Sequence, residues 1–176
     1  ERDEGDWTEL PELDAEYSAM ICLESLLLHE ALAAAGDPRD PARMAVAVRQ
    51  ERRKNLPPGV ILAENEMEYD EGTATYVQAR LMQLMCERGG IKPLRVGADP
   101  CYCGFSDLGD PFGGYLERIL SPEGMIVTFF HSQYNNGMAI GLLLDRLRPG
   151  WKREMRERGI TQFDILERAC PVTESD

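Results

Sequence analysis

One long stretch with helical spacing constrains the fold more than any other feature. From about Val60 to Cys86, apolar or small residues recur at steps of three, four and seven, which is the period of a helix and not of a strand. These residues are Ala63, Met67, Ala74, Val77, Leu81, Leu84 and Met85. We therefore predict one helix over 60–86, with this apolar stripe facing the core.

A second, acidic stripe runs along the same helix. Its members, spaced i, i+4, i+7 and i+11, are Glu64, Glu68, Glu71 and Thr75. This spacing places all of them on one face. Three carboxylates on one face repel each other unless water or a cation screens their charges. The pattern leaves two interpretations open: a solvated acidic face, or a metal or acid–base site at the edge of the core.

Composition narrows the class of protein. The 176 residues are enough for one domain, and 19 Lys and Arg against 31 Asp and Glu give a formal charge of −12. This negative charge disfavours nucleic acid and anionic membranes as partners. No apolar run approaches the roughly 20 residues of a membrane-spanning helix. Five cysteines without a CxxC pair indicate reduced thiols and a cytoplasmic protein.

The rest of the chain also favours helices. We predict helices over 14–35 and 40–54, with Asp14 and Asp40 as their N-caps, and over 138–147, 151–158 and 161–169, the last capped by Thr161. A short helix is expected over 115–120, and the Gly- and Pro-rich segment 91–114 is expected to be an irregular loop. The predicted fold class is mainly α, a single helical bundle-like domain over 1–176.

The two histidines do not complete a known motif. His29-Glu30 could begin a His-Glu-x-x-His zinc helix, but that motif needs its second histidine at position 33, which is Ala. We therefore expect His29 to be a packed or surface residue. His131 follows an apolar run and is either a histidine at the edge of the core or a substrate-binding residue.

Three segments carry a resemblance to a known family. Glu71-Gly-Thr-Ala-Thr-Tyr76 resembles the N-E-G-x-A-x-Y segment of gluzincin metallopeptidases of the aminopeptidase type. Tyr134-Asn-Asn-Gly137 resembles their Y-x-K-G segment, with Asn136 at the position of the Lys, and follows at a similar separation. The sequence LLLDRLRPGWK over 142–152 is similar to the L-L-D-R-L-x-P-G-W-K of bacterial gluzincin-like proteins.

The resemblance implies a fold and a function. The fold would be the helical C-terminal subdomain of a zinc-dependent peptidase-like hydrolase acting on a peptide or small molecule. Glu71 would be the third zinc ligand, and Tyr134 would donate a hydrogen bond to the oxyanion. The residues expected to contact the substrate are Glu64, Glu68 and His131. Zinc would be held only with ligands from outside this chain, which would be inactive alone.

The departure from the family is the missing His-Glu-x-x-His helix, which would lie upstream of Trp7. The helical pair predicted over 14–54 also lengthens the gap to Glu71, so Glu24 is a rival third ligand. An alternative function is therefore a non-catalytic helical domain that binds a partner or small ligand, and a purely structural bundle is a third. The sequence does not determine the substrate or the oligomeric state.

Overall fold

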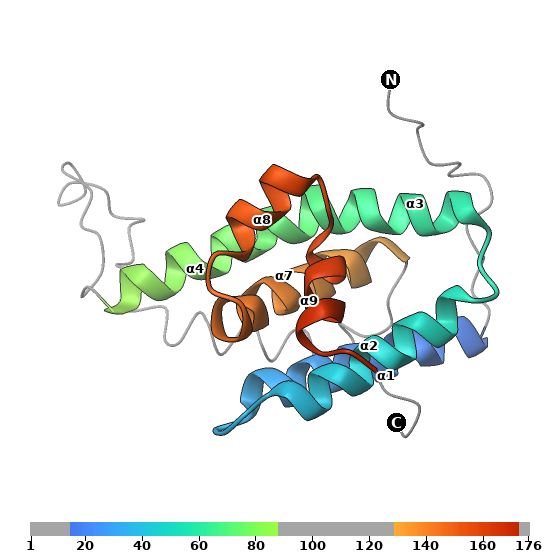
Figure 1. Ribbon diagram of the computed structural model, residues 1–176, viewed down its shortest axis with the longest axis horizontal. Coiled ribbons are helices and arrows are strands. Elements are labelled where there is room, and N and C mark those ends of the chain that lie inside the picture. Colours follow the sequence, from blue (N-terminus) through green and yellow to red (C-terminus); the bar gives the residue numbers. More distant parts are fainter. Residues whose placement is uncertain (1–14, 88–128, 173–176) are drawn as a thin grey trace, which may run out of the picture.

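The computed structural model describes residues 15–87 and 129–172, and these are mainly helical, which confirms the mainly α part of the predicted fold class (Figure 1). The elements in chain order are α1 (Ala15–Ala33), α2 (Arg39–Arg53), α3 (Pro58–Met67), the π-helical turn η2 (Glu68–Gly72), α4 (Thr73–Glu87), α7 (Phe129–Leu147), α8 (Trp151–Arg158) and α9 (Gln162–Ala169). The loop predicted over 91–114 and the helix predicted over 115–120 lie outside the described residues.

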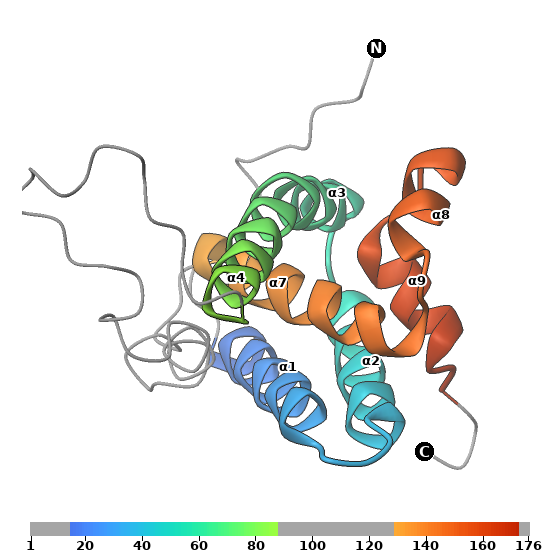
Figure 2. The same ribbon diagram turned by 90° about the vertical axis from the view of Figure 1, so that its left-hand side faces the viewer.

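Helix α7 lies at the centre of the bundle. The pair α1 and α2 packs on one side of it, the long rod of α3, η2 and α4 on another, and α9 on a third (Figure 2). Its buried apolar residues include Met138, Ile140, Leu143 and Leu144, which join one core with side chains of α1, α2, α4, α8 and α9. Within 15–87 and 129–172, no helix is both long enough and apolar enough to span a membrane.

The long helix forms as predicted, but a different stripe faces the core. It runs from Pro58 to Glu87 and is interrupted only by η2. Of the expected apolar stripe, Ala63 is buried and Met67 half-buried, whereas the later members Ala74, Val77, Leu81 and Leu84 are exposed. The side chain of Met85 lies outside the described residues.

The π turn explains this difference. Buried positions along the rod include Val60, Glu64, Glu68, Gly72 and Tyr76, so a run of four-residue steps continues through η2. A regular helix alternates steps of three and four, and a π turn adds one residue to a turn. The added residue rotates everything after it by about 100° relative to a regular α-helix. The second half of the apolar stripe therefore leaves the core. Of the acidic stripe, Glu64 and Glu68 are buried, and Glu71 and Thr75 are half-buried.

Helix ends match the prediction in part. Thr161 caps α9 as predicted, because its Oγ accepts from the Asp164 N–H at 3.1 Å while the Asp164 carboxylate accepts from the Thr161 N–H at 2.7 Å. The prediction that Asp40 caps α2 is wrong, because the helix already begins at Arg39. The Arg39 N–H donates instead to the Asp37 carboxylate at 3.1 Å. Helix α7 begins at Phe129, earlier than predicted, so Asn136 and Gly137 lie inside a helix.

Candidate site where η2 packs on α7

Two glycines allow η2 and α7 to approach each other closely. A Cβ placed on Gly72 would lie 2.7 Å from the Cα of Gly137, and a Cβ on Gly137 would lie 2.6 Å from the Cα of Gly72. Real Cβ atoms do not approach backbone that closely, so only glycine fits at both positions. These are the glycines of the two segments that resemble the metallopeptidase motifs, and the fold brings the segments into direct contact.

The close approach places Glu71 beside Tyr134. The Tyr134 hydroxyl lies near the Glu71 carboxylate. Partial burial raises the pKa of the Tyr134 phenol above its ordinary value of 10.0, and the nearby carboxylate of Glu71, with its negative charge, raises it further. The phenol is therefore neutral at physiological pH and keeps a proton that it can donate.

This contact predicts a measurable titration. Replacing Glu71 by Gln should lower the pKa of Tyr134 toward 10.0, because the amide carries no negative charge to oppose the phenolate. Because folding raises the pKa of Tyr134, the protonated phenol stabilises the folded state at pH values below its unfolded pKa. This contribution to the free energy of unfolding is lost as pH rises through the folded pKa. NMR of ring-labelled tyrosine would follow the titration, with Tyr134→Phe to assign the resonance.

The control for this titration is Glu66→Gln, which removes a carboxylate from the same helix but not one that contacts Tyr134. It should leave the Tyr134 pKa unchanged. An unchanged pKa in Glu71→Gln would show that the two side chains do not interact in solution.

The acidic residue Glu64 lies inside the protein and not at its surface. It is fully buried, and its carboxylate accepts hydrogen bonds from Tyr17 (2.9 Å), Arg53 (3.0 Å) and Arg52. Burial alone would raise the pKa of Glu64, but the charges of Arg52 and Arg53 outweigh it and hold the pKa below its usual range. Glu64 is therefore ionised and neutralised within the fold.

Glu68 and Glu24 share a second buried arginine. The Arg49 guanidinium donates from Nε to Glu24 at 2.7 Å and from Nη1 to Glu68 at 2.6 Å. Nearby, Asn136 of α7 donates to Glu24 at 3.3 Å and accepts from Ser25 at 2.8 Å. The second carboxylate oxygen of Glu68 is buried without a hydrogen-bond partner among the described residues.

These contacts change the meaning of the basic run at the end of α2. Basic residues in the last turn of a helix complement its dipole, but here Arg49, Arg52 and Arg53 pair with the three carboxylates inside the bundle. The guanidinium groups of Arg49 and Arg53 also stack on the Phe163 ring of α9, at 4.4 and 5.0 Å from its centroid. Three positive and three negative charges cancel, so the cluster, which we call the arginine–glutamate core, is neutral.

The third segment that carries the resemblance has a structural role. Asp145 accepts hydrogen bonds from Tyr76 (2.7 Å), Trp151 (3.0 Å) and Lys152 (2.7 Å), and so joins α4, α7 and α8. Arg146 donates to the carbonyl oxygens that end α1, from Ala31, Leu32, Ala34 and Gly36. The residues of this segment therefore hold the helices together, and none of these contacts lies at the Glu71–Tyr134 pair.

The histidines do not join this pair through any described contact. His29 is half-buried on α1, and burial lowers its pKa. His131 lies in the first turn of α7, and its side chain is outside the described part of the structure. Within 15–87 and 129–172, no group of three or more His, Cys, Asp or Glu side chains could hold a metal ion.

Of the residues predicted from the sequence, Glu71 and Tyr134 lie together in the fold. Glu64 and Glu68 are buried in its interior. Sequence reasoning did not identify the partners of these carboxylates, Arg49, Arg52 and Arg53. The only signal was three arginines spaced i, i+3 and i+4 on α2, a spacing that places them on one face.

Comparisons with protein-family models, with curated proteins and with solved structures gave no match.

Proposed function

We propose that this chain is part of a zinc-dependent peptidase-like hydrolase, in which Glu71 binds the metal and Tyr134 donates a hydrogen bond beside it. The observation that supports this proposal is the proximity of the two side chains. They come from different helices and from the two segments that resemble the family, and packing of Gly72 on Gly137 brings those segments together.

Zinc in a catalytic site is held by three protein ligands. Glu71 supplies one carboxylate, and the described residues offer no group that completes a site, so the remaining ligands would come from outside them. When bound, zinc supplies an activated water and polarises a substrate carbonyl. In this chain Tyr134 would keep a proton on its hydroxyl and donate it as a hydrogen bond to the substrate oxygen where negative charge develops.

Glu71 suits the role of ligand better than its rival Glu24. The Glu24 carboxylate is buried between Arg49 and Arg52, and a metal could reach it only by breaking those ion pairs. Glu71 is half-buried, and no ion pair joins it to an arginine or lysine in the described part of the chain. Of these two carboxylates, that of Glu71 is therefore the one whose charge no arginine or lysine among the described residues compensates.

The test uses the full-length native protein that contains this chain. Zinc content is measured by atomic spectroscopy, and hydrolysis is measured on a mixed peptide pool. Glu71→Gln should lose bound zinc and activity together. Tyr134→Phe should keep the zinc but lower kcat by about 10²–10³, as loss of one oxyanion donor does.

The matched control is Glu66→Gln, a carboxylate of the same helix that does not contact Tyr134. It should retain both zinc and activity. A wild-type protein that takes up no zinc, or a Glu71→Gln variant that keeps a full equivalent, would contradict the proposal.

A second candidate is a non-catalytic helical domain that binds a partner or small ligand. It is favoured by the burial of Glu64 and Glu68 against arginines, because neither carboxylate is then free to contact a substrate. A calorimetric zinc titration of the full-length protein separates the two candidates: stoichiometric binding that depends on Glu71 supports the hydrolase, and no binding supports the binding domain.

A further inference from the structure

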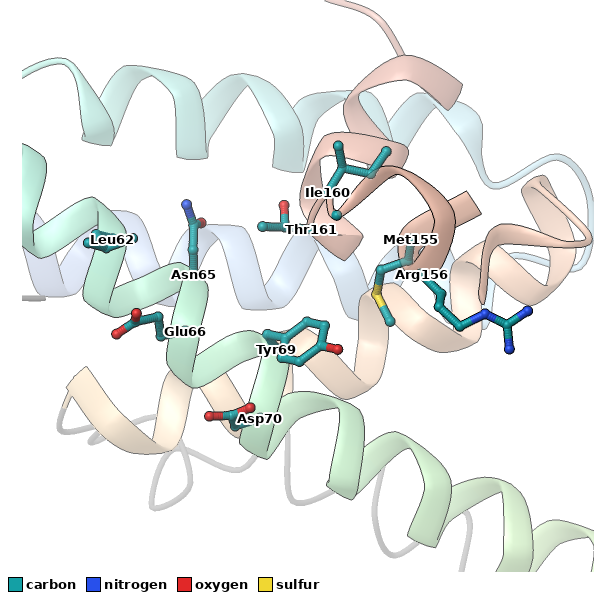
Figure 3. Close-up of a pocket in the computed structure, with 10 residues that line it drawn as sticks. Leu62, Asn65, Glu66, Tyr69, Asp70, Met155, Arg156, Ile160 and Thr161 are labelled. Atoms are coloured by element: carbon teal, nitrogen blue, oxygen red, sulfur yellow. The ribbon is translucent and has the colours of Figure 1, made fainter. Parts of the chain in front are cut away.

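A pocket lies on a different face of the long helix from the arginine–glutamate core. It is bounded on one side by α3 and η2 and on the other by α8 and the turn into α9 (Figure 3). Its volume is about 640 Å³, within the range of sites that bind small molecules. Neither Glu71 nor Tyr134 lines it, so the pocket is separate from the pair of residues on which the proposed hydrolase rests.

Apolar side chains form much of the pocket wall. Leu62 and Tyr69 come from the long helix, and Met155 and Ile160 face them from α8 and the following turn (Figure 3). Tyr69 is 43% exposed although it is aromatic, and its ring extends toward Met155 across the pocket. An aromatic ring beside a thioether offers a surface for a flat apolar or aromatic group.

The charged groups of the pocket favour a cation. Glu66 and Asp70 are one helical turn apart, and no hydrogen bond or ion pair joins either of them to another described residue. The pocket also includes Gly159 at the C-terminal end of α8, the negative end of that helix dipole. Arg156 is the one cation among the lining residues, and its guanidinium points away from both carboxylates (Figure 3).

We propose that this pocket binds a small amphipathic cation, an aromatic or aliphatic body that carries one ammonium group. The body would lie against Tyr69 and Met155, where it buries apolar surface. The ammonium group would lie near Glu66 and Asp70, because a positive charge would relieve the repulsion between these two carboxylates.

The test titrates the protein with tryptamine and follows the Met155 methyl resonance by NMR. The neutral analogue tryptophol and the anionic indole-3-propionate have the same ring and serve as matched probes. We expect saturable shifts with tryptamine, weaker binding of tryptophol and no binding of the anion. Adding 0.5 M salt should weaken tryptamine binding, since exposed charges are screened.

Variants of the lining residues test the site itself. Glu66→Gln combined with Asp70→Asn should weaken tryptamine binding about 3- to 10-fold, the effect of two partly exposed ion pairs. Tyr69→Ala should weaken it at least about fivefold through lost stacking and burial. Glu157→Gln, an exposed acid of α8 that does not line the pocket, is the control and should change nothing.

Three results would overturn the proposal. They are no saturable shift with tryptamine up to its solubility limit, binding of the anion as tight as that of the amine, and tryptamine binding that neither pocket variant weakens. The variant Glu71→Gln keeps this test apart from that of the hydrolase, because it should abolish zinc binding and leave tryptamine binding unchanged.

Discussion

Replacing Arg49 by Met is expected to lower the free energy of unfolding by about 3–5 kcal/mol, the cost of removing one partner from a buried ion pair. Arg49 is 1% exposed and bridges Glu24 and Glu68, so its loss leaves two buried carboxylates short of a cation. A typical domain has only about 5–15 kcal/mol of stability, so this is a large part of the total. Urea denaturation followed by circular dichroism measures the change.

Two further variants make this result interpretable. Arg39→Ala removes an exposed arginine from α2 that pairs only with Asp37 in the described contacts, and should cost less than about 1 kcal/mol. The double variant Arg49→Met/Glu68→Leu removes one of the two stranded charges, so it should recover much of the loss if uncompensated charge is its cause. A double variant less stable than Arg49→Met would show that packing by the arginine, and not its charge, stabilises the bundle.

The second large effect is expected at the glycine contact between η2 and α7. Gly137→Ala should destabilise the protein by about 2–3 kcal/mol, even though alanine is the better helix former. The new Cβ would meet the Cα of Gly72 at 2.6 Å, and backbone cannot move aside as a side chain can. Urea denaturation measures the loss. The helices must separate, so the pKa of Tyr134 should also fall toward its ordinary value.

Gly36→Ala is the matched control for this substitution. A Cβ at Gly36 has no atom within 4 Å, so its effect on stability should stay within about 0.5 kcal/mol. If Gly137→Ala were as stable as Gly36→Ala, the close approach of η2 and α7 would not exist in solution. If it were unstable but left the Tyr134 pKa unchanged, the glycine contact would not position the Glu71–Tyr134 pair.

Local signals in the sequence were enough to predict the helices. The period of the apolar residues predicted the rod that begins near Val60, and Thr161 marked the start of α9, because both depend on residues within a few positions of each other. The start of α7 was missed by local reasoning. Asn-Gly is a common turn pair, but Gly137 lies inside a helix because its missing side chain makes room for η2.

The candidate site could be predicted only in part. Family resemblance selected Glu71 and Tyr134, and their contact follows from the packing of two helices. The environments of Glu64 and Glu68 could not be predicted, because an acidic stripe has the same sequence pattern whether water or arginine faces it. Their partners come from a separate helix, Arg49 for Glu68 and Arg52 for Glu64.

The sequence by itself determined that this chain is helical, where most of its helices lie, and that one helix carries a row of carboxylates. Only the tertiary structure decided which side of that helix is buried. A single π turn changes the helical phase, and a change of phase alters the face of every later residue without altering the local preference for helix. The same packing placed three arginines against three glutamates and left Glu71 beside Tyr134, because charge pairing depends on distances between helices that no local pattern contains.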